Sequence, residues 1–153
     1  MTLLLVRHAD AGDRAAWTGD DSARPLSATG RAQSQALVDH LAAEPVASIF
    51  SSPARRCIDT VEPIAHARGL AVEVDDALAE GTPLDVADRL LRRLRSSDVL
   101  LCSHGDVLGA IITSLRRRGA ISDRPRWPKG STWILEGWPD PGRLEYLAPP
   151  EVD

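Results

Sequence analysis

Three short apolar runs of this 153-residue chain stop at residues that can bind or attack a phosphoryl group. The residues at these ends are Arg7-His8, Ser51-Ser52 followed by Arg55-Arg56, and Ser103-His104-Gly105. Ligands of an open α/β sheet gather beyond the carboxyl ends of its strands. We therefore expect these side chains to converge on one anion.

Arginine and histidine suit complementary steps of phosphoryl transfer. A planar guanidinium binds phosphate through two parallel hydrogen bonds, so two arginines from different strand ends would clamp a phosphoryl group. A neutral imidazole beside that clamp can attack phosphorus and carry the phosphoryl group. A second histidine can donate to a non-bridging oxygen as charge develops in the transition state. Such a site needs no metal ion and no cofactor.

Single features of this kind also have plainer interpretations. An isolated Arg-His pair is more commonly a solvated surface feature. The interpretation as a site therefore depends on the matching residues at all three strand ends. His40, on the expected inner face of one helix, and His66, late in another, are interpreted as structural. The run Arg116–Arg118 is interpreted as the solvated end of a helix.

Other kinds of ligand site have weaker support. Four acidic residues near the first strand end could form a hard-metal site, but they lack regular ligand spacing and are expected to shape or charge the mouth of the pocket. Three tryptophans could stack on a base, although an aromatic-packed pair of edge strands is the plainer interpretation. Neither a GxxxxGK[ST] loop nor a GxGxxG loop is present. The residues concerned are Asp10, Asp13, Asp20 and Asp21, and Trp127, Trp133 and Trp138.

Composition points to an ordinary globular protein. With 43% apolar and 26% charged residues, the chain can bury a core, and we expect one domain over residues 1–153. The net charge of −4 does not favour a nucleic-acid partner. No signal segment precedes the first apolar run, and no run is long enough to span a bilayer, so we expect a cytoplasmic protein without a membrane partner. Cys57 and Cys102 are expected to be free thiols.

Strands and helices are expected to alternate along the chain. Strands are predicted at 2–6, 46–50, 70–74 (an edge strand) and 99–102, with a late pair at 131–136 and 143–147. Helices are predicted from an N-cap at Ser27 to about Ala43, from Ser52 and Pro53 to Arg68, from Leu84 to Arg95, and after Gly105 to a stop at Gly119. This alternation predicts an α/β fold with three α/β/α layers and a mostly parallel central sheet.

Four segments together resemble the histidine phosphatase superfamily, also called phosphoglycerate mutase-like. "LLLVRHADAG" resembles its RHG signature, with Ala9 where glycine is usual. "RPLSATGRAQSQAL", "SSPARRCIDT" and "SHGD" are similar to its later segments, in order and at family spacing. The resemblance covers most of residues 3–108 and implies the phosphoglycerate mutase-like fold.

The resemblance also implies roles for individual residues. His8 would be the nucleophile, Arg7 and Arg56 phosphate ligands, and His104 the second histidine of the phosphate pocket, with Gly105 beside it. Arg56 is preferred to Arg55 because Thr60 follows it four positions on. Glu80, in "LAEG", occupies the region where the family often has a general acid, although this segment could equally be a solvated loop.

Several activities are compatible with such a site. The short chain and its opening segments look most like SixA-type phosphohistidine phosphatases, whereas "WPKGSTWIL" is similar to the phosphatase-like domain fused to Nudix domains in actinobacteria. We expect a metal-independent phosphatase acting on phosphohistidine, with a small-molecule or nucleotide phosphomonoesterase as the alternative. A mutase would need a cover for which there is little spare length. A non-catalytic phospholigand-binding module is the rival of another class. The protein is expected to be a monomer or a weak dimer.

Overall fold

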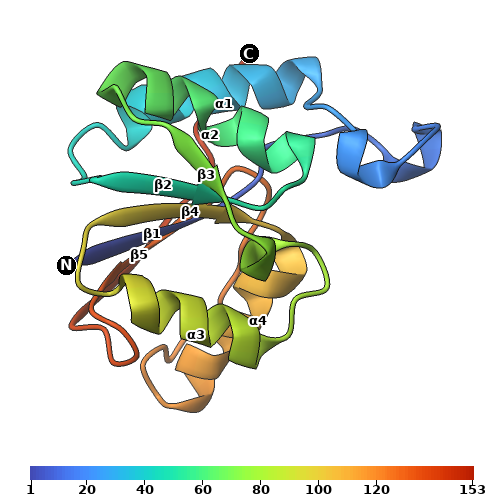
Figure 1. Ribbon diagram of the computed structural model, residues 1–153. Coiled ribbons are helices and arrows are strands. Elements are labelled where there is room, and N and C mark those ends of the chain that lie inside the picture. The colour runs from blue at the N-terminus through green and yellow to red at the C-terminus, as the bar shows by residue number, and fades with distance from the viewer.

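The computed structural model describes all 153 residues and consists of a six-stranded sheet between two pairs of helices (Figure 1). Helices α1 and α2 cover one face of the sheet, and α3 and α4 cover the other. The α/β class and the three layers expected from the sequence are confirmed. The elements are β1 (Thr2–Arg7), α1 (Ala28–His40), β2 (Ser48–Ser51), α2 (Arg55–Arg68), β3 (Val72–Val74), α3 (Leu84–Leu94), β4 (Val99–Ser103), α4 (Gly105–Arg117), β5 (Thr132–Glu136) and β6 (Arg143–Leu147), with 3₁₀ turns at Arg14–Ala16, Asp21–Ala23 and Asp76–Leu78.

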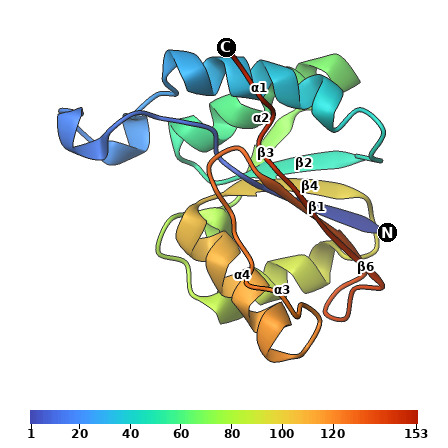
Figure 2. The same cartoon turned by 180° about the vertical axis from the view of Figure 1, so that it is seen from behind.

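The strand order is β3-β2-β4-β1-β5-β6. The first four strands in this order are parallel to their neighbours, and β5 and β6 add an antiparallel hairpin beside β1. The prediction of a mostly parallel sheet with β3 at an edge and a late strand pair is therefore confirmed. Behind the sheet, the last residues run from β6 toward α1 (Figure 2), where His40 Nε2 lies 2.9 Å from the Ala148 carbonyl.

Successive residues of β1 alternate between two apolar cores. Leu3 and Leu5 face the core shared with α3 and α4, while Leu4 and Val6 face the core shared with α1 and α2. A strand with both faces covered needs apolar residues at every position, which explains the unbroken run that opens the sequence. None of the helices has both the length and the apolar character needed to cross a membrane.

The helix boundaries agree with the sequence at some ends and differ at others. Ser27 caps α1 as predicted, its hydroxyl accepting from the Gly30 N–H at 3.0 Å, and Gly69 ends α2 in the left-handed conformation with φ of 66°. However, α1 ends at His40 instead of about Ala43.

Two expectations were wrong. Helix α2 begins at Arg55 with Ala54 as its N-cap, not at Ser52 and Pro53, because the Ser52 side chain turns inward and contacts His104. His40 is exposed instead of lying on the inner face of α1. Its position near the helix end leaves its ring beside the C-terminal segment.

Gly30 is required by a close approach of the chain. A Cβ atom at this position would lie 1.8 Å from the Asp10 carbonyl oxygen, a backbone atom that cannot rotate away. We predict that Gly30→Ala lowers the free energy of unfolding by about 3 kcal/mol or more, the upper range for overpacking. Urea denaturation measures this, with Gly142→Ala, whose Cβ would meet open space, as the matched control. Equal stability of the two variants would contradict the prediction.

Candidate active site

The carboxyl ends of β1, β2 and β4 meet at one edge of the sheet. Beyond them lies a cavity of about 420 Å³ lined by Arg7, His8, Glu80, His104 and Gly105. Arg56 lies behind its wall, where its guanidinium contacts both Glu80 and His104. The structure therefore brings together the six residues that the sequence predicted for the site, namely Arg7, His8, Arg56, Glu80, His104 and Gly105.

His8 is held as a neutral imidazole with a free Nε2. It is 5% exposed, and its Nδ1 lies 2.8 Å from the Ala9 carbonyl, which can only accept, so Nδ1 carries the hydrogen. The pKa of His8 is lowered to about 3, mainly by burial. The hydrogen bond to Ala9 raises this pKa, whereas the charges of His104, Arg56 and Arg7 lower it further. The Nε2 lone pair is therefore available for attack at neutral pH.

The Arg7 guanidinium lies against the first turn of α4. A Cβ at Gly105 would come within 2.8 Å of Arg7 Cζ, so a side chain at this position would displace the guanidinium. Arg7 Nη1 donates to the Trp127 carbonyl at 3.0 Å, whereas its buried Nε has no hydrogen-bond partner within the protein. A buried donor of this kind favours an acceptor such as a phosphoryl oxygen.

Arg56 is the buried arginine of the pair in "SSPARRC". Its side chain is 1% exposed, whereas that of Arg55 is 58% exposed and pairs with Asp59 one helical turn away. Arg56 Nη1 donates to the Asp21 carbonyl at 2.9 Å, and Nη2 contacts the carboxylates of Asp21 at 3.1 Å and Glu80 at 3.2 Å. The buried Nε of Arg56 also has no partner within the protein.

His104 faces His8 and is positioned by β2. The two rings lie 5.4 Å apart at an interplanar angle of 67°. His104 Nε2 is 2.8 Å from Ser52 Oγ, and its Nδ1 is 3.3 Å from Arg56 Nη2. Because the Ser52 hydroxyl can either accept or donate, His104 can present at Nδ1 a lone pair to Arg56 or an N–H to a phosphoryl oxygen.

Glu80 points toward the site from the segment between β3 and α3. Its two carboxylate oxygens contact Arg14 at 2.7 Å and Arg56 at 3.2 Å. The next residue, Gly81, donates its N–H to Asp106 in the first turn of α4 at 2.7 Å. Glu80 is therefore not on an outward-facing loop, one of the two interpretations that its sequence left open.

Sequence reasoning named Ser52, Thr60 and Trp127 but missed the contacts through which they hold the main groups in place. Thr60 accepts from the Ala9 N–H at 2.9 Å, Ser52 contacts His104, and the Trp127 carbonyl accepts from Arg7. The position of Ser52 directly after a strand was the only available signal. For Thr60 and Trp127 the sequence separations of 51 and 120 residues left no local signal.

The four acidic residues near the first strand end have separate partners. Asp10 accepts from the Ser27 hydroxyl, Asp13 and Asp20 cap the first two of the three 3₁₀ turns, and Asp21 pairs with Arg56. Asp13 also lines the cavity. No cluster of three or more His, Cys, Asp or Glu side chains has the geometry of a metal site. Cys57 and Cys102 are free, as expected, and both are buried.

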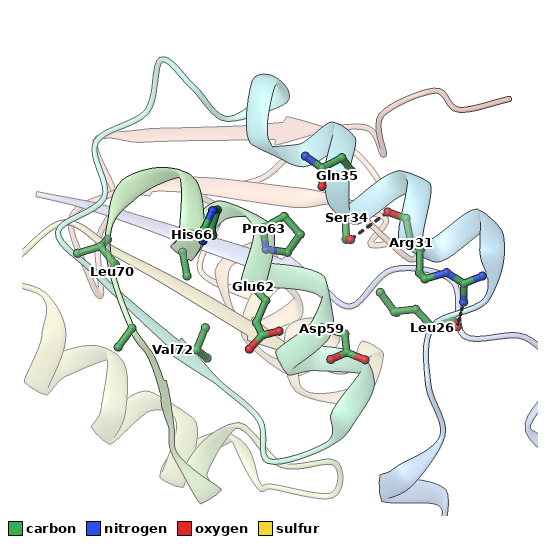
Figure 3. Close-up of a pocket in the computed structure, with 12 residues that line it drawn as sticks. Leu26, Arg31, Ser34, Gln35, Asp59, Glu62, Pro63, His66, Leu70 and Val72 are labelled. Carbon is green, nitrogen blue, oxygen red and sulfur yellow. Dashed lines mark hydrogen bonds between the residues drawn. The ribbon is translucent and has the colours of Figure 1, made fainter.

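A larger cavity of about 730 Å³ lies between α1 and α2 and holds none of the six predicted site residues (Figure 3). In this cavity, Arg31 donates to the Leu26 carbonyl at 3.2 Å, and the side chain of His66 is exposed. Size alone does not select the functional cavity. The buried arginines and histidines are found at the strand ends instead.

The low pKa of His8 predicts a pH dependence of stability. Because the folded pKa of about 3 lies below the ordinary value of 6.5, the unfolded chain binds the extra proton as the pH falls through this interval, and stability decreases. Between pH 7 and pH 5, His8 should contribute a loss of about 2 kcal/mol, which His8→Gln removes. Urea denaturation of both proteins at the two pH values measures this. An equal loss in the parent and the variant would exclude a buried neutral His8.

Two comparisons identify proteins with related sequences. A model of the histidine phosphatase superfamily, branch 1, matches residues 3–82. The 8-oxo-(d)GTP phosphatase of Mycolicibacterium smegmatis is 33% identical over 161 residues, which cover 98% of this chain and 49% of that protein. The chain thus spans about half the length of this curated relative.

Solved structures show the same fold. The protein histidine phosphatase SixA complexed with tungstate superposes with a TM-score of 0.80 at 21% identity, covering 97% of each chain. A mycobacterial glucosyl-3-phosphoglycerate phosphatase has a TM-score of 0.69 at 19% identity, covering 95% of this chain and 96% of that one. The phosphoglycerate mutase-like fold is therefore confirmed. The chain belongs to the histidine phosphatase superfamily, branch 1.

Proposed function

We propose that the chain is a phosphatase that works through a phosphohistidine intermediate on His8. The observation that carries this proposal is the buried imidazole with Nδ1 bound to the Ala9 carbonyl, in a cavity shared with Arg7 and His104. A binding module would need the arginines, but it would not need a histidine kept neutral with one nitrogen free. This feature favours a catalyst over a non-catalytic phospholigand-binding module.

The reaction has two displacements at phosphorus. Before the first displacement, Glu80 gives up its ion pairs with Arg14 and Arg56 to the bound phosphoryl group and takes up a proton from solvent. In the first displacement, the His8 Nε2 lone pair forms a bond to phosphorus, and the bond from phosphorus to the leaving group breaks while protonated Glu80 gives that group its proton. In the second, water attacks the phosphoryl group on His8 and gives a proton to the Glu80 carboxylate. Phosphate leaves, neutral His8 is restored, and Glu80 releases the proton to solvent as its ion pairs form again.

Arg7, Arg56 and His104 stabilise the charge on the phosphoryl oxygens. Each arginine has a buried Nε without a partner in the protein, and His104 faces His8, so these three side chains supply the donors. These cationic and neutral donors perform the task that a metal ion performs in other phosphatases. We therefore propose a metal-independent reaction without a cofactor.

The position of Glu80 bears on the substrate class. An alkyl phosphate leaves as a poor alkoxide unless it is protonated, whereas the imidazole of phosphohistidine needs little help. A carboxyl group at the cavity therefore supports hydrolysis of phosphomonoesters in addition to phosphohistidine. The 33% identity to an 8-oxo-(d)GTP phosphatase makes nucleotides a second candidate class.

Residues 1–153 are proposed to act as one domain, because both helix layers pack on the same sheet.

The first test is turnover of a substrate panel with and without chelator. The panel contains p-nitrophenyl phosphate, an alkyl phosphate, nucleotides and a phosphohistidine protein. We expect phosphate release that chelator does not change, no release by His8→Ala, and a loss of about 3 kcal/mol of transition-state stabilisation in Arg56→Ala, the magnitude expected for one preorganised donor.

Arg55→Ala is the matched control for Arg56→Ala, because the neighbouring exposed guanidinium is removed without touching the cavity. Near-parental activity is expected for this variant. Loss of activity with chelator would exclude the metal-independent mechanism. No activity on any member of the panel would favour the phospholigand-binding module.

A second test isolates the acid. Glu80→Gln removes the proton donor and keeps the size of the side chain, so hydrolysis of the alkyl phosphate should fall by about a hundred-fold, within the range typical of general acid catalysis. Hydrolysis of p-nitrophenyl phosphate and phosphohistidine should change much less, since their leaving groups are stable without a proton. If all three substrates respond equally, Glu80 is not the acid, and a phosphohistidine phosphatase becomes the preferred interpretation.

A further inference from the structure

One edge of the Arg7 guanidinium is held by the protein, and the other is free. Nη1 donates to the Trp127 carbonyl at 3.0 Å, and Nε is buried without a partner. A guanidinium binds phosphate well through two adjacent N–H groups on one edge. The contact with Trp127 therefore fixes the orientation of the guanidinium and leaves Nε free to donate to a ligand.

Two glycines of α4 accommodate the two partners. A Cβ at Gly105 would lie 2.8 Å from Arg7 Cζ, and a Cβ at Gly109 would lie 2.8 Å from Cζ2 and 2.9 Å from Cε2 of the Trp127 indole. Positions four residues apart lie on the same face of a helix. Arg7 and the Trp127 indole therefore pack side by side on α4, each against a position without a side chain.

Trp127 belongs to a long segment between α4 and β5, part of which is exposed. Ser122–Arg124 and Pro128 are exposed. The segment is tied at the Arg126 carbonyl, which accepts from Trp133 Nε1 at 2.9 Å, and at the Gly130 N–H, which donates to the carbonyls of Arg7 and His8 at 3.1 Å. The Pro128 carbonyl also accepts from the N–H and the hydroxyl of Ser131. Together with these ties, the packing of the indole on Gly109 holds Trp127 in place.

We propose that Trp127 is a positioning residue for Arg7: its indole, packed on Gly109, fixes the backbone carbonyl that orients the guanidinium toward the phosphoryl group. The inference rests on the proposed function only in assigning phosphoryl binding to Arg7. The side chain of Trp127 acts through its own backbone, so the sequence alone gives no sign of this role. Trp133 and Trp138, by contrast, are buried core residues.

The test measures tungstate binding by calorimetry, together with KM and kcat where turnover is found. Gly109→Ala places a methyl group against the indole and should weaken tungstate binding about ten-fold, because small displacements of a positioned group are costly. In an Arg7→Ala background the same substitution should change tungstate affinity less than about two-fold. This non-additivity separates a role through Arg7 from a general structural effect, which would persist in both backgrounds.

Gly142→Ala is the control for a glycine-to-alanine change, since its Cβ would meet open space away from the cavity. If Gly109→Ala does not fold, Trp127→Ala removes the indole without adding atoms and enters the same comparison. Unchanged tungstate affinity in a folded variant, or an equal loss with and without Arg7, would overturn the inference. Coupled tungstate binding in a chain that hydrolyses no substrate would refute the proposed function and leave this inference standing.

Discussion

The parallel pairing of β4 with both of its neighbours determines where the strand-end groups of the site lie. Arg7 is paired with Ser103, and Ser51 with Cys102. The ladder continues past the strands, because the His8 N–H donates to the Ser103 carbonyl and the Ser52 N–H donates to the Cys102 carbonyl, both at 3.0 Å. A shift of one residue in β1 would exchange its two faces and separate His8 from His104. The two apolar cores prevent this shift, so packing far from the cavity maintains the geometry within it.

The buried charge of Arg56 is the second constraint, and it ties two surface segments to the core. A guanidinium that is 1% exposed must be paired and hydrogen-bonded. Its partners, Asp21 and Glu80, come from the segments after β1 and before α3, and their side chains are 34% and 42% exposed. Partly solvated carboxylates are less costly to rearrange than buried ones. In the proposed function, Arg56 therefore exchanges some of these contacts for phosphoryl oxygens while the fold stays intact.

The parts of this arrangement that could be predicted from the sequence are those encoded locally. Apolar runs ending in Arg7-His8 and Ser103-His104 indicated strands with polar ends, and the rules of parallel sheets indicated their convergence. Ser27 and Gly69 indicated helix ends because capping depends on neighbouring residues. The start of α2 was misplaced because Ser52 contacts His104 instead of capping the helix. The contact of the Trp127 carbonyl with Arg7 could not be predicted, because a backbone group has no sequence signature.

Residue 9 shows how the site tolerates a departure from its family. The RHG signature has glycine at this position, yet Ala9 supports His8 through its main chain: its carbonyl receives the Nδ1 hydrogen of His8, and its N–H donates to Thr60. Neither contact involves the side chain. The added methyl group is fully buried in a small apolar cluster with Ala11 and Leu26. Because the contacts that residue 9 makes with His8 and Thr60 use only its backbone, alanine can make them wherever the surrounding packing leaves room for one methyl group.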